Sequence, residues 1–144
     1  MVSMGKLFDR RNGICIYCDG ETWTPHRLTK DAARERFGLQ KHAPHHAKRL
    51  KFKMATKEHL VRIADGGENG ANIDLACLFC NTTRGERTPA EHRELMLKLV
   101  AAGRHPTHSG LPTEVTTMNL KKWARNALRQ IIRDIAVEQL DPPR

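Results

Sequence analysis

The sequence predicts an α+β fold, in which a short β-hairpin is flanked by helices. Three observations lead to this prediction: two widely separated C-x-x-C pairs, two short strand-type segments around a glycine-rich turn, and several helix-capping signals. The 144 residues match the length of one domain. Only 39% of them are hydrophobic and 5% aromatic, so the core is small and a cross-link through the cysteines would stabilise it.

The first third of the chain contains a turn, a helix and a basic segment. GICIYCDGE is a short apolar stretch bounded by Gly13 and Gly20, which is typical of a knuckle-like turn. Thr29 is suited to cap a helix through DAARERF that ends at Gly38. The following segment, KHAPHHAKRLKFK (41–53), is expected to form a loop.

The middle of the chain has the pattern of a hairpin followed by a helix. MATKEHLVRI (54–63) is rich enough in β-branched and apolar residues for a strand, and IDLAC (73–77) predicts a second one. Between them ADGGENGAN (64–72) contains three glycines and two asparagines, which is typical of a turn. A helix is expected to start within CLFCNTTRGE (77–86).

Two further helices are predicted. Thr88 and Glu91 form a capping box around Pro89, which opens a helix that stops at Gly103. Residues 104–118 are polar and turn-rich and are expected to link a core domain (1–103) to a C-terminal amphipathic segment (119–144).

The last helix is expected over residues 119–139. Its apolar positions step by three and four, which gives one apolar face: Leu120, Ala124, Ala127, Leu128, Ile131 and Ile135. A basic side lies opposite: Lys121, Lys122, Arg125, Arg129 and Arg133. The apolar face predicts packing on the core, with self-association or DNA contact as alternatives.

The charge distribution points to a polyanionic partner. The formal net charge is +9, and residues 1–53 carry 12 basic and 5 acidic side chains. The segment 41–53 has five Lys or Arg and three His without an acid, so it is either a solvated loop or a nucleic-acid contact. Nucleic-acid contacts are expected from six side chains: Lys48, Arg49, Lys51, Lys53, Arg62 and Arg84.

The cysteines form two pairs, Cys15-Ile-Tyr-Cys18 and Cys77-Leu-Phe-Cys80. Two such pairs in a reducing compartment indicate a four-thiolate zinc site. A redox C-x-x-C or buried structural cysteines are the alternatives. Four thiolates leave no open position for water, so the expected zinc is structural.

Six features in this order resemble the HNH endonuclease family, in its four-cysteine zinc-containing branch. They are Glu58-His59-Leu60-Val61, Gly66-Gly67, Asn72, Ala76-Cys77-x-x-Cys80, Asn81 and the preceding Cys15-x-x-Cys18. The resemblance covers about residues 13–87. It implies a ββα-metal, treble-clef-like core and a phosphodiester hydrolase acting on DNA. Arg62 stands where many relatives have proline, which alters the expected shape of the loop.

The resemblance also implies residue roles. His59 matches the general base, and Glu58 with Asn81 match the ligands of a catalytic Mg²⁺ or Mn²⁺. Asn72 matches the asparagine that holds the hairpin loop, and the four cysteines match the zinc ligands. Because neighbours on a strand point to opposite sides, Glu58 and His59 need a twist, a bulge or the strand's end to reach one phosphate.

The chemistry is consistent with these roles. A neutral histidine can take a proton from water near pH 7, and a hard divalent ion held by oxygen ligands can neutralise charge at phosphorus. The other seven histidines, His45 and His46 included, lie outside this pattern. The alternatives are a non-catalytic zinc-stabilised nucleic-acid-binding module, and a zinc-stabilised protein-interaction domain anchored by the last helix and Trp123.

The setting is inferred from what the sequence lacks. It has no apolar run of membrane-spanning length and no signal-type N-terminus, which predicts a cytoplasmic protein without a membrane partner. Small HNH proteins are common in phage, so DNA in a phage or bacterial cell and a packaging or other protein partner are expected by analogy.

Overall fold

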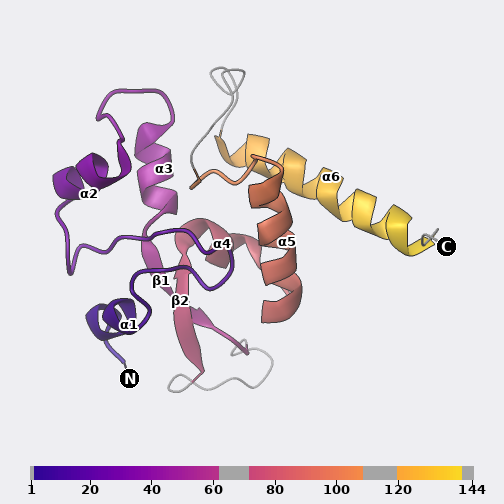
Figure 1. The fold of residues 1–144 in the computed structure, drawn as a ribbon, viewed down its shortest axis with the longest axis horizontal. Helices are drawn as coiled ribbons and strands as arrows, with labels where there is room; N and C mark the ends of the chain where they lie inside the picture. Colours follow the sequence, from indigo (N-terminus) through magenta and orange to yellow (C-terminus); the bar gives the residue numbers. More distant parts are fainter. Residues whose placement is uncertain (1, 62–71, 109–119, 141–144) are drawn as a thin grey trace.

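The computed structural model describes residues 2–61, 72–108 and 120–140. A two-stranded antiparallel sheet, β1 (Ala55–His59) and β2 (Ile73–Cys77), lies near the middle of the molecule with helices around it (Figure 1). The architecture is α+β, as predicted from the sequence.

The hairpin has a regular register. Ala55 pairs with Cys77 and His59 with Ile73, with consecutive pairs between them. The Leu60 N–H donates to the carbonyl of Asn72 at 2.9 Å, just beyond the last pair. The ladder is unbulged over these pairs and β1 ends at His59. Of the twist, bulge or strand end expected at Glu58 and His59, the described ladder shows the end of the strand and no bulge.

Helix α1 (Met4–Arg10) covers one face of the hairpin and was not predicted from the sequence. Ser3 caps it by accepting from the Lys6 N–H at 3.3 Å. Its buried Leu7 packs against Ala55 and Leu75. The N-terminal segment therefore contributes to the core.

The knuckle around the first cysteine pair is attached to both strands. The Ile16 N–H donates to the Leu75 carbonyl at 3.0 Å. Trp23 and Met54 form a parallel bridge, and the Ala55 N–H donates to the Trp23 carbonyl at 2.7 Å. These bonds bring residues 14–23 alongside the sheet.

Two helices lie beyond the knuckle. Helix α2 (Lys30–Phe37) begins after Thr29 and ends at Gly38, whose φ of 66° is left-handed, as predicted. Helix α3 (His46–Phe52) occupies the basic segment that was expected to be a loop. Leu50 on α3 packs with Ala33 and Trp23, so this segment has a buried apolar side. The sequence-based prediction missed it because the segment is rich in basic residues.

Helix α4 (Leu78–Thr83) follows β2 directly, and α5 (Pro89–Ala101) follows α4 after a short turn. Thr88 and Glu91 form the predicted capping box, with Pro89 at the first helical position. Gly103 beyond α5 has a φ of 69°, so a left-handed residue follows the helix where the sequence predicted its stop.

Helix α6 (Leu120–Leu140) packs on α5 through the predicted apolar face and extends away from the rest of the chain at its C-terminal end (Figure 1). Trp123, Ala124 and Leu128 are buried, and the basic side is exposed at Lys122 and at the arginines that follow it. No helix among the described residues is both long and apolar enough to cross a membrane.

The segment expected to be a linker begins within the core. His105, Pro106 and Thr107 are buried, and His105 lies against Phe79. Its later part, 109–118, lies outside the described residues. Residues 105–108 therefore belong structurally to the core domain.

Candidate metal centre

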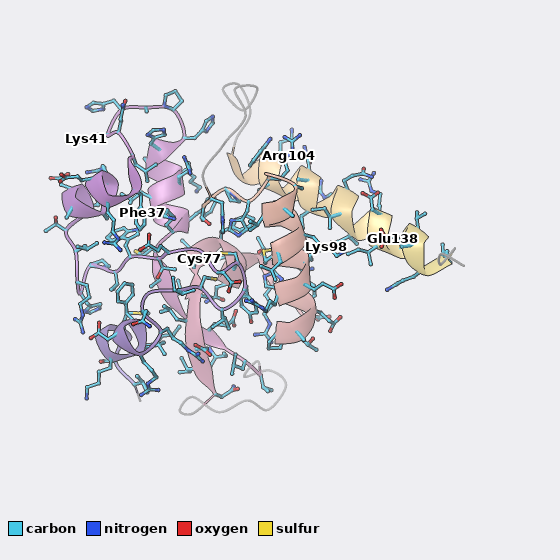
Figure 2. All side chains as sticks on the ribbon, viewed as in Figure 1. Phe37, Lys41, Cys77, Lys98, Arg104 and Glu138 are labelled. Carbon is cyan, nitrogen blue, oxygen red and sulfur yellow. The ribbon has the colours of Figure 1, made fainter. Side chains whose placement is uncertain are left out.

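The four cysteines come together in one buried cluster, as the sequence predicted. Each is at most 2% exposed, and their Sγ atoms all lie within 4.8 Å of one another. Cys77, at the junction of β2 and α4, lies near the middle of the molecule, whereas Lys41 lies at its rim (Figure 2). No disulfide joins them. A four-thiol group of this size could hold a metal ion such as zinc.

The ionisation of the thiols favours a cation at this place. Burial raises the pKa of Cys77 and of Cys80 well above the ordinary value. Hydrogen bonds from Cys15, and next from Cys77 and Cys80, lower the pKa of Cys18. Buried thiols therefore cannot all ionise together without a compensating positive charge, which a divalent ion would supply.

Backbone N–H groups and aromatic rings support the cluster. Cys77 is the N-cap of α4 and its sulfur accepts from the Cys80 N–H at 3.4 Å. The Cys15 sulfur accepts from the Tyr17 N–H at the same distance. Between the two cysteines of each pair stands a buried aromatic residue. Tyr17 packs edge to face on His92, and Phe79 packs edge to face on Phe52. The cluster is thus held by packing as well as by its turns.

Three histidines near the cluster were not singled out by sequence reasoning. His105 is 2% exposed, and its Nε2 lies 3.2 Å from the Cys80 sulfur. His92 is fully buried, and its Nε2 lies 2.7 Å from the Cys80 carbonyl oxygen. Ligand atoms of Cys18, His105 and His108 also lie within 4.8 Å of one another. These histidines stand 12 to 28 residues after Cys80, a spacing too irregular to identify them from the sequence.

Glu58 is buried in an ion pair. Its side chain is 6% exposed, and its Oε1 accepts from Nη1 of the equally buried Arg84 at 3.0 Å. Its Oε2 is buried without a hydrogen-bond partner, as is the nearby Tyr17 hydroxyl. Burial raises the pKa of Glu58 against the opposing effect of Arg84, and burial followed by the charge of Glu58 raises the pKa of Tyr17. Glu58 and Tyr17 interact electrostatically without a well-formed hydrogen bond.

Arg84 joins α4 to the end of β1. Its Nη1 also donates to the His59 carbonyl, and its Nη2 donates to the Leu60 carbonyl at 2.7 Å. Its Nε donates to the Arg87 carbonyl at 2.8 Å. This placement differs from the expected nucleic-acid contact, because the guanidinium is directed into the protein.

The remaining residues of the HNH-like pattern lie around the end of β1. His59 is half-buried on the last pair of the ladder. The Asn72 side chain accepts from the Val61 N–H at 2.9 Å and donates to the Val61 carbonyl at 2.6 Å, so it closes the base of the loop. The Asn81 Nδ2 donates to Thr56 Oγ1 at 2.9 Å and to the Lys57 carbonyl at 3.2 Å. Asn81 therefore lies against β1, at Thr56 and Lys57.

The other expected nucleic-acid contacts divide into two groups. Lys48 and Lys51 are exposed on α3. Lys53 is buried and donates to the Thr107 carbonyl at 3.1 Å, and Arg49 donates to the carbonyls of Pro106 and His108. Arg62 lies outside the described residues. Only Lys48 and Lys51 of the described members are available at the surface.

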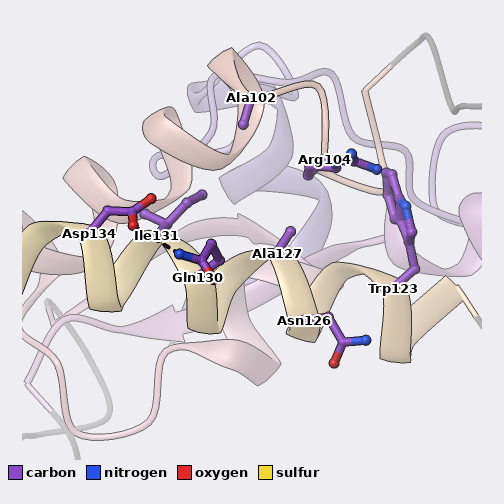
Figure 3. Close-up of a pocket in the computed structure, with 8 residues that line it drawn as sticks. All are labelled: Ala102, Arg104, Trp123, Asn126, Ala127, Gln130, Ile131 and Asp134. Carbon is purple, nitrogen blue, oxygen red and sulfur yellow. Dashed lines mark hydrogen bonds between the residues drawn. The ribbon is translucent and has the colours of Figure 1, made fainter.

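A pocket of about 400 Å³ lies elsewhere, between α6 and the end of α5 (Figure 3). Ala102, Trp123 and Ile131 line it, and Gln130 donates to Asp134 along its edge at 2.9 Å. It contains neither the cysteines nor the residues of the HNH-like pattern. This pocket is a feature of the α5–α6 contact rather than part of the metal centre.

A scan against protein-family models, a search of curated proteins and a search of solved structures found no match to this chain.

Proposed function

We propose that the protein is a metal-dependent endonuclease of the HNH type that hydrolyses phosphodiester bonds in DNA. The observation that carries this proposal is the contact of Asn81 with β1. Its Nδ2 donates to the Lys57 carbonyl at 3.2 Å, so the residue after Cys80 contacts the strand that carries Glu58 and His59. The hairpin, the helix that follows it and the cysteine cluster then provide one frame for the four residues of the motif.

In this proposal His59 is the general base that accepts a proton from the attacking water. It stands where β1 ends, and Arg84 holds its carbonyl from α4. Asn72 holds the first loop residue after Leu60 by the paired bonds to Val61. These contacts restrict the backbone at His59 and directly after it, which is the preorganisation that proton transfer requires.

Glu58 and Asn81 would hold the catalytic divalent ion. A carboxylate and an amide oxygen are the donors that Mg²⁺ and Mn²⁺ prefer, and the unpartnered Oε2 of Glu58 is a buried anionic oxygen that a cation would satisfy. When bound, the ion would neutralise negative charge at the phosphate. Arg84 already balances part of the charge of Glu58, so we expect Mg²⁺ to bind weakly in the absence of DNA.

The cysteine cluster would hold a structural zinc ion. Cys80 and Asn81 are consecutive, so an ion that fixes Cys80 also fixes the helical turn that presents Asn81. The exposed cations of α3 and of the basic side of α6 supply positive surface for the DNA backbone.

A non-catalytic zinc-stabilised nucleic-acid-binding module is the second candidate. The specific observation in its favour is the buried Glu58–Arg84 ion pair, because it gives Glu58 a structural partner. In that case the cations would bind nucleic acid in a salt-dependent manner without cleavage.

Cleavage of supercoiled plasmid separates the two candidates. The zinc-loaded protein is incubated with plasmid in Mg²⁺, in Mn²⁺ and in EDTA, and binding is measured in parallel by gel shift. The nuclease proposal predicts that the protein nicks or linearises the plasmid in Mg²⁺ or Mn²⁺ but not in EDTA. It also predicts a strong loss of cleavage in Glu58→Gln and in Asn81→Ala. Binding without cleavage at any concentration of either ion would support the binding module.

A further inference from the structure

The segment that follows α5 turns back onto the cysteine cluster. His105 is 2% exposed and its Nε2 lies 3.2 Å from the Cys80 sulfur. The ring also packs edge to face on Phe79, with centroids 4.8 Å apart. Phe79 belongs to the second cysteine pair, so two contacts join His105 to the same helical turn.

The other ring nitrogen of His105 defines the tautomer. The backbone N–H of Thr107 donates to Nδ1 at 3.3 Å, and the Thr107 hydroxyl lies 2.8 Å from the same atom. A nitrogen that accepts from an N–H cannot carry a proton itself, so in the neutral ring the proton is on Nε2. The Nε2–H therefore points at the Cys80 sulfur and donates to it.

Such a bond matters when the sulfur is a thiolate. Four thiolates around one Zn²⁺ leave a formal charge of −2 inside the protein, and N–H donors reduce the basicity of the thiolates that carry it. Cys77 and Cys15 already accept from backbone N–H groups, of Cys80 and Tyr17 respectively. His105 adds a side-chain donor to Cys80.

Two cations, Arg49 of α3 and Lys53 directly after this helix, hold this segment in place. The Lys53 ammonium donates to the Thr107 carbonyl at 3.1 Å. Arg49 donates from Nε to the Pro106 carbonyl at 3.2 Å and from Nη2 to the His108 carbonyl at 2.9 Å. Three consecutive carbonyls are thus bound by side chains from a distant part of the sequence, and residues 105–108 form a fixed cover over the cluster.

We propose that His105 is a positioning residue for the metal centre, which donates its Nε2–H to the Cys80 thiolate and slows release of the bound zinc. The proposal rests on the zinc ion of the proposed function but not on nuclease activity. Removal of an outer hydrogen-bond partner of a metal ligand typically costs about 10- to 100-fold in metal affinity.

The neighbouring His108 provides the competing arrangement. Its Nε2 is buried without a hydrogen-bond partner, and its ligand atom lies within 4.8 Å of those of Cys18 and His105. These three groups could instead bind a second ion, with Cys18 shared. In that arrangement His105 Nε2 would be unprotonated, contrary to the bond from the Thr107 N–H.

The test compares zinc release from three variants. Zinc transfer to the chromogenic chelator 4-(2-pyridylazo)resorcinol is followed for the wild type, His105→Leu and His105→Gln, with exposed His42→Leu as the control. We expect His105→Leu to release zinc about 10- to 100-fold faster. His105→Gln, whose amide N–H can occupy the place of Nε2–H, should remain within a few-fold of the wild type. Equal release from the Leu variant and the wild type, or equal acceleration in Leu and Gln, would overturn the proposal.

Two further readouts make the result independent of folding and of cleavage. In the Co²⁺-substituted protein the sulfur-to-metal charge-transfer bands should move to lower energy in His105→Leu but not in His105→Gln. If the Leu variant fails to fold, His105→Phe, which keeps a ring against Phe79 but has no N–H, should release zinc at least several-fold faster. No acceleration in that variant would contradict the proposal. Elemental analysis should give one zinc per wild-type chain. Two zinc ions per chain would assign His105 to a second metal site and overturn the proposal. A wild type without zinc would overturn both proposals, because both assume that the cysteine cluster binds zinc. A wild type that binds zinc but does not cut DNA would contradict only the nuclease proposal.

Discussion

Cys80 is the residue on which the polar side chains of the interior converge. Its sulfur faces His105, its carbonyl accepts from His92, and its N–H donates to the Cys77 sulfur. The next residue is Asn81, which contacts β1. The residue that would bind the metal is therefore followed directly by the residue whose contact with β1 supports the proposed nuclease site.

The buried position of His92 predicts that the free energy of unfolding decreases at acidic pH. Arg87 donates to its Nδ1 at 3.2 Å, so protonation would place two positive groups together, and burial lowers its pKa to about 4. Between an unfolded pKa of about 6.5 and the folded value the unfolded chain binds more protons, so the free energy of unfolding falls as the pH decreases. The loss from this residue is roughly 3 kcal/mol over that range, since one pKa unit corresponds to about 1.4 kcal/mol.

Urea unfolding of the zinc-loaded wild type and His92→Gln at several pH values checks this. Acid release of zinc affects both proteins, so the difference between them isolates the histidine. The difference in free energy of unfolding should change in favour of the Gln variant as the pH falls from 6.5 to 4. A difference that stays constant with pH would show that His92 does not titrate in this way.

Replacement of Arg84 is expected to destabilise the protein strongly. In Arg84→Met the Glu58 carboxylate stays buried without its cation, which typically costs about 3–5 kcal/mol. The double variant Arg84→Met with Glu58→Gln removes the buried charge and should recover part of that loss. Chemical denaturation measures both, and an Arg84→Met variant as stable as the wild type would contradict the ion pair.

At the scale of elements, capping signals in the sequence correctly predicted two of the helices. Thr29 and Gly38 bound α2, and the capping box at Thr88 opens α5. Helix α3 was missed because His45, its N-cap, makes no side-chain cap bond and its seven residues HAKRLKF include three Lys or Arg. Its apolar side is defined by the packing of Leu50 beside Trp23, a contact between residues far apart in the sequence.

The candidate site was predictable only in part. The cysteine cluster follows from two C-x-x-C pairs, because two such pairs are typical of a four-thiolate metal site. The ion pair of Glu58 with Arg84 and the contact of His105 with Cys80 each join residues 25 or 26 positions apart. Such contacts depend on how α4 and the segment after α5 pack in three dimensions. A short sequence pattern does not predict this packing.

The cap of α5 gives a prediction for this element. In Thr88→Ala the Glu91 N–H loses its acceptor, which typically costs about 1 kcal/mol. Thr82→Ala is the matched control, because the Thr82 hydroxyl donates only to carbonyls within its own helix. Urea denaturation should show a loss for Thr88→Ala that Thr82→Ala lacks, and equal values would argue against the cap.

At the scale of the whole molecule, the proposed zinc joins parts of the chain that lie far apart in the sequence. The knuckle, the hairpin, α4 and the segment after α5 all meet at the cluster. Removal of the ion should therefore unfold the core rather than loosen one loop. We expect a strong chelator to abolish most of the helical circular-dichroism signal and the cooperative thermal transition, with recovery on adding Zn²⁺. A chelated protein that keeps both would show that the cysteines stabilise the fold by packing alone.

The rate of plasmid cleavage by His59→Ala tests the central claim most directly. His59→Ala and the control His42→Ala are compared with the wild type at matched zinc content, matched helical signal and saturating Mg²⁺ or Mn²⁺. The proposed general base predicts that His59→Ala loses at least about 100-fold in rate while His42→Ala cuts as the wild type does. Cleavage by His59→Ala at the wild-type rate would contradict the assignment and the HNH mechanism with it.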